Sequence, residues 1–496
     1  MSKLGSLLKD TVIYGMSSIV GRFLNYLLVP LYTAKMSVES GEYGVVTNMY
    51  AWTAFILVVL IFGMETTFFR FADRQKGNVS QVFSMCLQVV GVLCALFLAG
   101  VFLNIGSLAP LLGYASHPEF ITMMAVVVAL DALQSIPFGL LRFQGRPIKF
   151  ASLKMLNIIT NIALNLIFFL LLPYLYGKNP DSVSAFYSPD KQSYYVFLIN
   201  LICTSFITLF FIPELRMYRP VHDVALLKKM LSYSWPLLLL GIAGILNLNA
   251  DKILYPQLVP GAQGRAELSV YGASVKIAAI MAMLMQAFRF AYEPFVFGNR
   301  DKEDSKALYA KAMKYFIAVA LFAFLCVVFY MDLIKYIISP DYWAGLKVVP
   351  LVMAAEIFMG IYFNLSFWYK LIDKTIYGAW FSLAGCIVLF AVNIIFIPRY
   401  SYMACAWGGF AGYGTAMLLS YIVGQRKNPI NYPLKSMAVY VAITCLFFGI
   451  MQALPQEWPA ILRMGINTIL VIAFVGHIIY HDLPLRNLPV IGKFFR

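Results

Sequence analysis

Long apolar runs recur along the whole chain, and they constrain its fold more than any other feature. A helix needs about 20 predominantly apolar residues to cross a bilayer. Only 12% of the 496 residues are charged, about half the share that is typical of soluble chains. The sequence therefore predicts an all-α integral membrane protein with about fourteen transmembrane helices. The runs cover approximately residues 11–34, 44–69, 79–103, 119–141, 150–172, 193–213, 229–256, 269–297, 310–331, 345–369, 375–397, 402–424, 434–453 and 459–480.

The gaps between these runs differ in their content of cations. The gaps after odd-numbered runs hold few, such as Lys35, Lys178 and Arg265. The two tails and the other gaps hold most of them, and cytoplasmic loops are the ones enriched in Lys and Arg. We therefore expect both termini to be cytoplasmic. An even number of helices agrees, since it places both termini on the same side of the membrane. This bias accounts for the net charge of +15 without a nucleic-acid partner.

A short repeat indicates two related halves. Residues 7–15 (LLKDTVIYG) resemble residues 226–234 (LLKKMLSYS), and both segments begin an odd-numbered run. Six runs separate them, which is what two six-helix halves in the same orientation would produce. We expect an N-terminal lobe over residues 1–216 and a C-terminal lobe over 217–427, around a central cavity. Residues 428–496 would form two further helices and a cytoplasmic tail.

Metal, disulfide and ATP chemistry find no support in the sequence. The seven cysteines all lie inside apolar runs, the four histidines form no ligand cluster, and no GxxxxGK[ST] motif occurs. The first run is longer than the apolar part of a signal peptide and lacks a small-x-small cleavage site. It reads as the first transmembrane helix, and we expect neither a metal nor an organic cofactor.

Polar side chains recur on single faces of several predicted helices. A charge at the centre of a bilayer costs about 2.5–3.5 kcal/mol on insertion scales, so it must face a cavity or a partner. In the first helix Ser18, Arg22 and Asn25 lie within a sector of about 80°, and Arg22 has no neighbouring acid. The other candidate cavity residues are Asn157, Asn161 and Asn247, the cations Lys252, Lys276 and Arg289, and the acids Glu65, Asp251, Glu293 and Glu356.

Several of these residues also have a structural interpretation. The asparagines can join neighbouring helices by hydrogen bonds. Arg289 and Glu293 are four residues apart and can neutralise each other on one helix. Lys252 can pair with the adjacent Asp251 or extend toward the membrane surface. Both interpretations stay open at this point.

Three classes of function fit a chain of this kind: a transporter, a membrane-embedded glycosyltransferase or ligase, and a structural subunit. The predicted extracytoplasmic loops are short and poor in paired carboxylates, which disfavours an enzyme. A structural subunit would not explain the central Arg22. A transporter is therefore expected, with no catalytic residues. Since Arg and Lys suit phosphate, its cavity cations favour an anionic headgroup such as a lipid pyrophosphate.

Five segments carry a resemblance to a known family: LLKDTVIYGMSSIVGRFLNYLLVPLYT, EYGVVTNMYAW, GMETTFFRFADRQ, LLRFQGRPIKFA and YSWPLLLLGIAGILNLNADKILY. They resemble the polysaccharide flippase branch of the multidrug/oligosaccharidyl-lipid/polysaccharide exporter superfamily. The resemblance spans nearly the whole chain. It implies two six-helix lobes with two appended helices, and alternating access. It also implies movement of undecaprenyl-pyrophosphate-linked oligosaccharide, such as a lipopolysaccharide repeat unit, from the inner to the outer leaflet of a bacterial inner membrane.

The resemblance leaves two alternatives within the superfamily: a lipid II flippase and a multidrug exporter. Related lipid II flippases carry cavity arginines on helices 1 and 8, the helices of Arg22 and Arg289. Coupling to H⁺ or Na⁺ would need a membrane carboxylate, for which the candidates are Asp251, Glu65, Asp131, Glu293 and Glu356. Glu293 could exchange Arg289 with the pyrophosphate between two states.

Expected partners are the lipid-linked oligosaccharide and membrane lipids, with a polysaccharide polymerase or glycosyltransferases as candidate protein partners. Because one chain already contains both predicted lobes, a monomer is expected.

Overall fold

A computed structural model describes residues 26–74, 78–298, 305–372, 374–455 and 457–482. At residues 74, 182, 290, 291, 293–295, 297 and 298 it describes the backbone alone. Within these ranges the chain is helical and contains no strand. Twelve of the described helices are long and apolar enough to cross a membrane. The prediction of an all-α, multi-pass membrane protein is confirmed, with fourteen as an approximate number of spans.

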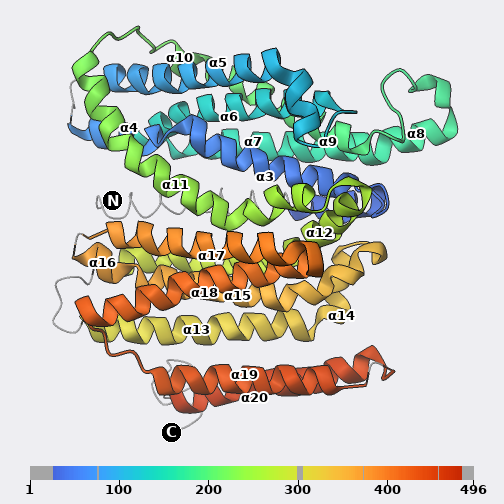
Figure 1. The fold of residues 1–496 in the computed structure, drawn as a ribbon, viewed down its shortest axis with the longest axis vertical. Coiled ribbons are helices and arrows are strands. Elements are labelled where there is room, and N and C mark those ends of the chain that lie inside the picture. Colours follow the sequence, from blue (N-terminus) through green and yellow to red (C-terminus); the bar gives the residue numbers. More distant parts are fainter. Residues whose placement is uncertain (1–25, 75–77, 299–304, 373, 456, 483–496) are drawn as a thin grey trace. The chain divides into compact units, whose positions relative to one another are not determined.

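The helices follow the predicted runs closely (Figure 1). The short helices are α2 (Leu28–Lys35), α4 (Met64–Arg74), α8 (Leu172–Lys178), α10 (Ile212–Leu215), α14 (Met331–Ile334) and α16 (Phe367–Leu371). The long helices of the first half are α3 (Glu42–Ile61), α5 (Val79–Leu111), α6 (Pro118–Phe143), α7 (Pro147–Leu166), α9 (Gln192–Leu209), α11 (Val224–Leu258) and α12 (Gly261–Gly298). Those of the second half are α13 (Ser305–Phe329), α15 (Val349–Leu365), α17 (Ile376–Tyr400), α18 (Tyr402–Lys427), α19 (Leu434–Ala453) and α20 (Ala460–Asp482).

Two predicted runs do not correspond to a single described helix. Most of the first, residues 11–34, lies outside the described residues, and so do Ser18, Arg22 and Asn25. Run 44–69 is two helices rather than one, since the backbone of Phe62 and Gly63 turns into the left-handed region with φ of 52° and 68°. Glycine adopts that region without steric cost, so Gly63 explains why α3 ends and α4 starts in a new direction.

The chain divides into two compact units. Unit 1 comprises Met1–Ala273 and Phe390–Cys405, and unit 2 comprises Ser274–Leu389 and Ala406–Arg496. In unit 1, α6 lies among α3, α5 and α9 (Figure 1). In unit 2, α13 packs against α15, α19 and α20. Helix α12 begins in unit 1 and continues into unit 2. The predicted lobes 1–216 and 217–427 stay a prediction.

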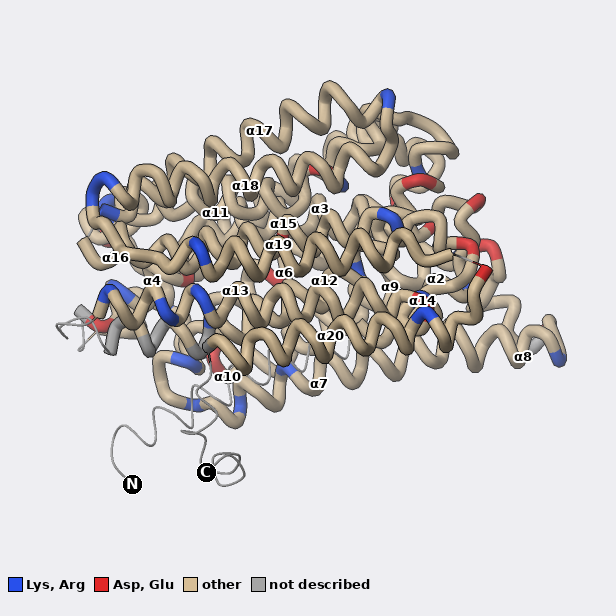
Figure 2. The backbone as a smooth tube through the Cα atoms, turned by 90° about the horizontal axis from the view of Figure 1, so that it is seen from below, with Lys and Arg blue, Asp and Glu red and all other residues tan. Residues whose placement is uncertain are grey.

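Charged residues gather near helix ends, and the lengths between them are mostly uncharged (Figure 2). One buried charge at such an end is compensated by cations. Glu214, on α10, is only 3% exposed, and its Oε1 lies 2.5 Å from the Lys149 ammonium and 3.7 Å from the Arg146 guanidinium. Because an isolated charge is costly to bury, this cluster fixes the turn between α6 and α7 against α10.

Candidate functional sites

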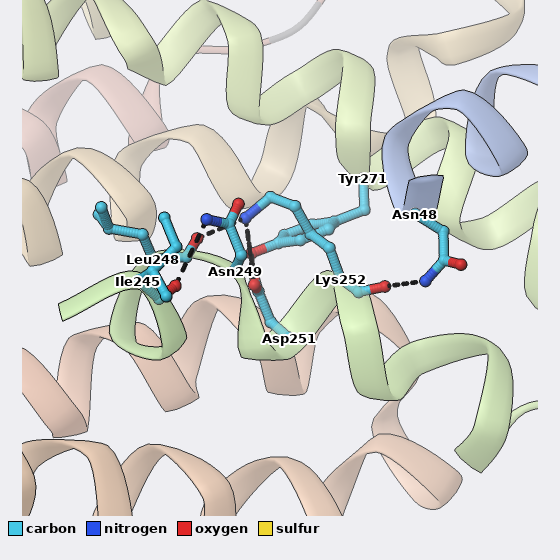
Figure 3. A network of polar contacts seen from close by, with 7 residues as sticks. All are labelled: Asn48, Ile245, Leu248, Asn249, Asp251, Lys252 and Tyr271. Atoms are coloured by element: carbon cyan, nitrogen blue, oxygen red, sulfur yellow. Dashed lines mark hydrogen bonds and ion pairs between the residues drawn. The ribbon is translucent and has the colours of Figure 1, made fainter. Parts of the chain in front are cut away.

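A network of polar contacts joins three helices of unit 1 (Figure 3). The Tyr271 hydroxyl of α12 donates a 2.5 Å hydrogen bond to Oδ2 of Asp251 on α11. The Lys252 ammonium lies 3.1 Å from Oδ1 of the same carboxylate. Asp251 is buried among these groups. A carboxylate at this depth is stabilised only while such partners hold it, so the Tyr271 hydrogen bond stabilises both Asp251 and the α11–α12 contact.

Helix α3 enters the network through Asn48. Its Nδ2 donates to the backbone carbonyl of Lys252 at 2.7 Å, and its Oδ1 accepts from the Tyr114 hydroxyl at 2.8 Å. Burial raises the pKa of the Tyr114 phenol, with the charge of Arg265 acting in the opposite direction. Tyr114 therefore stays a neutral donor near neutral pH, and Asn48 links α3 to α11 while its Oδ1 accepts from Tyr114.

The structure favours the neutralisation interpretation of Lys252. Its ammonium turns back along α11, where it donates to the Leu248 carbonyl at 3.0 Å as well as to Asp251. The side chains of Lys252 and Asp251 are 15% and 11% exposed. In this conformation Lys252 is occupied by a carboxylate, so it is not an open phosphate ligand.

Small residues bring α3 and α12 very close beside this network. The Gly44 amide donates to Ser269 Oγ at 2.7 Å. A Cβ atom on Gly44 would fall 2.2 Å from the Arg265 carbonyl, and one on Gly272 would fall 2.4 Å from Thr47 Oγ1. Contacts of small residues let helix backbones approach closely in membranes. The register of α3 on α12 therefore depends on both glycines.

Unit 2 contains a pair of cations on one aromatic ring. The Arg289 guanidinium of α12 lies 4.6 Å from the centroid of Phe363, and the Lys370 ammonium of α16 lies 5.0 Å from the same centroid. The side chain of Arg289 is exposed, and it makes no ion pair with the described residues. Cation–π contact orients such groups without neutralising them, so the exposed Arg289 guanidinium can still receive an anion.

Sequence reasoning did not select Lys370. It follows the run predicted over 345–369 by one residue, where it resembles an ordinary cation at a helix end. The aromatic spacing of Phe363 and Phe367 was the available signal, because both rings lie under the Lys370 ammonium, at 5.0 Å and 4.7 Å.

The other candidates of unit 2 are less informative. Lys276 is exposed on α12, and Glu356 is half-buried on α15, each with a polar partner of its own. The side chain of Glu293 lies outside the described part of the chain, so its exchange with Arg289 stays a prediction.

The asparagines of unit 1 include a helix-joining group. Asn165 donates to the Asn161 carbonyl at 2.8 Å and accepts from the Tyr32 hydroxyl at 2.7 Å, which joins α7 to α2. Asn157 is half-buried one turn earlier on α7. Asn247 is buried on α11 and donates to the Ala243 carbonyl at 3.0 Å. The Asn165 amide also lies 3.2 Å from Asn161 Oδ1, an arrangement typical of asparagines that join neighbouring helices.

Glu65 has a partner that the sequence did not indicate. On α4 it forms an ion pair with Arg142 at the end of α6. In the described part of the chain, no group of three His, Cys, Asp or Glu side chains could hold a metal ion.

Comparison of the sequence with known protein families and with curated proteins finds no match. Solved structures do match. A lipid II flippase, MurJ, in an inward closed conformation has a TM-score of 0.71 at 12% identity, over 95% of this chain and 99% of that one. An inward-facing multidrug resistance transporter of the MATE family, in the MOP superfamily, gives 0.60 at 15% identity, over 81% and 93%.

A third match is a MOP superfamily transporter from Pyrococcus furiosus, described as having a binding pocket of reverse polarity. Its TM-score is 0.52 at 15% identity, over 84% of this chain and 95% of that one. Similarity at these identities shows a common fold. These structures are of transporters and a flippase. The chain has the fold of MurJ and the MATE transporters.

Proposed function

We propose that this chain is a flippase that moves an undecaprenyl-pyrophosphate-linked oligosaccharide from the inner to the outer leaflet of a bacterial inner membrane. The observation that carries the proposal is the placement of Arg289 and Lys370 on the ring of Phe363. A pyrophosphate offers charged oxygens to both cations, and Arg can bind it through two hydrogen bonds. The shared fold with a lipid II flippase supports the same class of transport.

Alternating access supplies the movement in this proposal. The contacts of α3 with α11 and α12 hold one state, and separation of these helices gives the other. Asn48, Gly44 and Tyr271 are the residues whose contacts would have to open. A ligand shifts such an equilibrium only by binding one state better than the other, so substrate contacts must compete with these.

Ion coupling is assigned to Asp251. Protonation of its carboxylate would remove the charge that holds Lys252 and accepts from Tyr271. An inward-moving H⁺ would thereby weaken the α11–α12 contact. Na⁺ would instead replace Lys252 as the partner of the carboxylate. Glu65 is less suited, because Arg142 at the end of α6 already neutralises it.

The topology that fits this function has both termini in the cytoplasm. A monomer would suffice, with a polysaccharide polymerase or glycosyltransferases as the candidate protein partners. A lipid II flippase is a second candidate, favoured by the match to MurJ. A multidrug exporter is a third, favoured by the matches to MATE transporters.

Flipping of a polyprenyl-pyrophosphate oligosaccharide in proteoliposomes tests the proposal. Arg289→Met and Lys370→Met should each lower the initial flipping rate by about tenfold or more, as loss of a charge-assisted contact requires. Lys374→Met is the matched control, since Lys374 is an exposed cation near the same helix end and should be neutral. Wild-type rates in both Arg289→Met and Lys370→Met would remove the pyrophosphate site from Phe363.

A further inference from the structure

An open polar cavity of about 770 Å³ lies at one end of unit 1, and Tyr114 links its lining to Asn48 of the network around Asp251. The segments before α3, α6 and α9 surround it, together with the first turns of α3, α6, α9 and α12. The residues that matter for its chemistry are Glu42, Tyr114, His117, Gln192 and Arg265. They all belong to unit 1. A cavity of this size can hold one or two sugar rings.

Gln192 brings an unused hydrogen-bond acceptor to this cavity. Its Nε2 donates to the Pro189 carbonyl at 2.8 Å and to the Tyr187 hydroxyl at 3.2 Å. Gln192 is 7% exposed, and its Oε1 is buried without a hydrogen-bond partner among the residues that the structure describes. Since an unsatisfied buried acceptor is costly and uncommon, Oε1 needs a donor from outside the chain.

Arg265 brings unused donors. Its stem packs against the start of α3, so closely that a Cβ on Gly41 would lie 2.6 Å from its own Cβ. The guanidinium lines the cavity and makes neither an ion pair nor a hydrogen bond with the part of the chain that the structure describes. A packed stem with free donors is an orienting arrangement for a ligand oxygen.

The charges of the cavity select a neutral ligand. Its lining contains three cations, Lys35, Lys191 and Arg265, and three carboxylates, Glu42, Glu119 and Asp190. Two carboxylates are engaged: Glu42 accepts from the Ser193 amide at 3.1 Å, and Glu119 pairs with His117 at 3.0 Å. A phosphate site would have an excess of cations, and a cation site an excess of acids. A balanced set of donors and acceptors suits hydroxyl groups, which do both.

Aromatic surfaces complete the lining. The rings of His117 and Phe120 stack at 4.8 Å with an angle of 7° between them, and half of the His117 side chain is exposed. Tyr194 adds a third ring to the lining. Flat apolar faces beside polar side chains match a sugar, which has C–H faces and hydroxyl edges.

We propose that this cavity is a saccharide-binding site. Gln192 Oε1 accepts a hydrogen bond from one sugar hydroxyl, Arg265 donates to a neighbouring sugar oxygen, and the His117–Phe120 stack carries the ring face. The loops around this cavity follow odd-numbered apolar runs, and those gaps are the ones that hold few cations. If the proposed function holds, these loops are extracytoplasmic, and the ligand is the glycan headgroup after it has crossed. That last identification rests on the proposed function, whereas binding of a free saccharide does not.

Titration of the full-length protein in nanodiscs tests this site. The soluble probes are glucose, galactose, mannose, N-acetylglucosamine and chitotriose, with binding followed by saturation-transfer NMR. Wild type should bind at least one probe in the millimolar range, and Arg265→Met and Gln192→Met should each weaken it about tenfold. Arg265→Lys should recover part of the affinity. Lys178→Met, an exposed cation outside the cavity, should bind as wild type.

Two further measurements, the thermal midpoint of each variant and competition by lipid-linked ligands, identify the cause of lost binding and the ligand. The thermal midpoint of each variant excludes unfolding as the cause of lost binding, and Arg265→Met retains the stem that packs on Gly41. Competition by a polyprenyl-pyrophosphate oligosaccharide, but not by the bare polyprenyl pyrophosphate, would identify the headgroup as a ligand.

Binding without flipping would support a free-saccharide site and count against the proposed function. Flipping without saccharide binding, or binding that is equal in wild type and Arg265→Met, would overturn the saccharide site.

Discussion

The Tyr271 hydroxyl lies 2.5 Å from Asp251 Oδ2, and this hydrogen bond fastens α12 to α11. Lys252 approaches the other oxygen of the same carboxylate. One ionised group therefore satisfies a donor on each of two helices. Loss of this one carboxylate would remove both interactions at once, which makes this contact a suitable point of control for helix separation.

Removal of the Tyr271 hydroxyl should destabilise the described conformation. Tyr271→Phe keeps the ring and deletes a hydrogen bond to a charged acceptor, a loss of about 1.5–3 kcal/mol. The thermal unfolding midpoint in detergent should fall. Tyr480→Phe is the control, because Tyr480 is 83% exposed and should leave the midpoint unchanged. Equal midpoints for both variants would show that the Tyr271 hydrogen bond does not hold the helices together.

Added methyl groups should separate α3 from α12. In Gly44→Ala the new Cβ would meet the Arg265 carbonyl at 2.2 Å, and in Gly272→Ala it would meet Thr47 Oγ1 at 2.4 Å. Each should lower thermal stability and change the flipping rate. Gly449→Ala on α19 meets nothing within 4 Å, so the better helix propensity of Ala should make it neutral or stabilising by about 1 kcal/mol. Three indistinguishable variants would contradict the close approach.

In the cluster around Glu214, removal of one charged partner should destabilise the protein more than removal of both. Lys149→Met leaves a carboxylate that is 3% exposed with Arg146 at 3.7 Å as its remaining cation, and should cost up to about 3 kcal/mol. The double variant Lys149→Met, Glu214→Met should recover most of this loss. Unfolding of the single and double variants measures the difference, with the exposed Lys228→Met as control. A double variant less stable than Lys149→Met would contradict the account.

Neutralisation of Asp251 should uncouple flipping from the ion gradient. Asp251→Asn keeps the side-chain shape but can neither titrate nor form the ion pair with Lys252. Wild-type flipping should slow when the H⁺ or Na⁺ gradient is collapsed, and the variant should be slow in both conditions. The exposed Asp341→Asn is the control. A gradient response that persists in Asp251→Asn would move the coupling site elsewhere.

Much of the fold was predictable because bilayer thickness fixes how long an apolar helix must be. Run 79–103 is the core of α5, and run 434–453 coincides with α19. The break at Phe62 was not predictable, since it depends on the conformation of two residues inside one apolar run. Apolar length reports on membrane crossing and says little about a local change of direction.

The candidate sites were predictable only in part. Asp251 and Lys252 were selected because buried charges are costly, and their mutual pairing was one of two open interpretations. Lys370 was missed because its role comes from Phe363, seven residues earlier, rather than from its own position at a helix end. Gln192 and Arg265 were missed because loops that are distant in sequence form their cavity. Tertiary contact, rather than residue type, determines which polar groups remain unused.

The most direct test of the central claim compares two substrates in one preparation of wild-type proteoliposomes. The preparation would receive a fluorescent polyprenyl-pyrophosphate oligosaccharide and a membrane-permeant cationic dye, each with its own readout. A flippase whose exposed cations meet a pyrophosphate should flip the lipid and leave the dye gradient unchanged. Export of the dye with no flipping of the lipid would contradict the account and assign the chain to drug export.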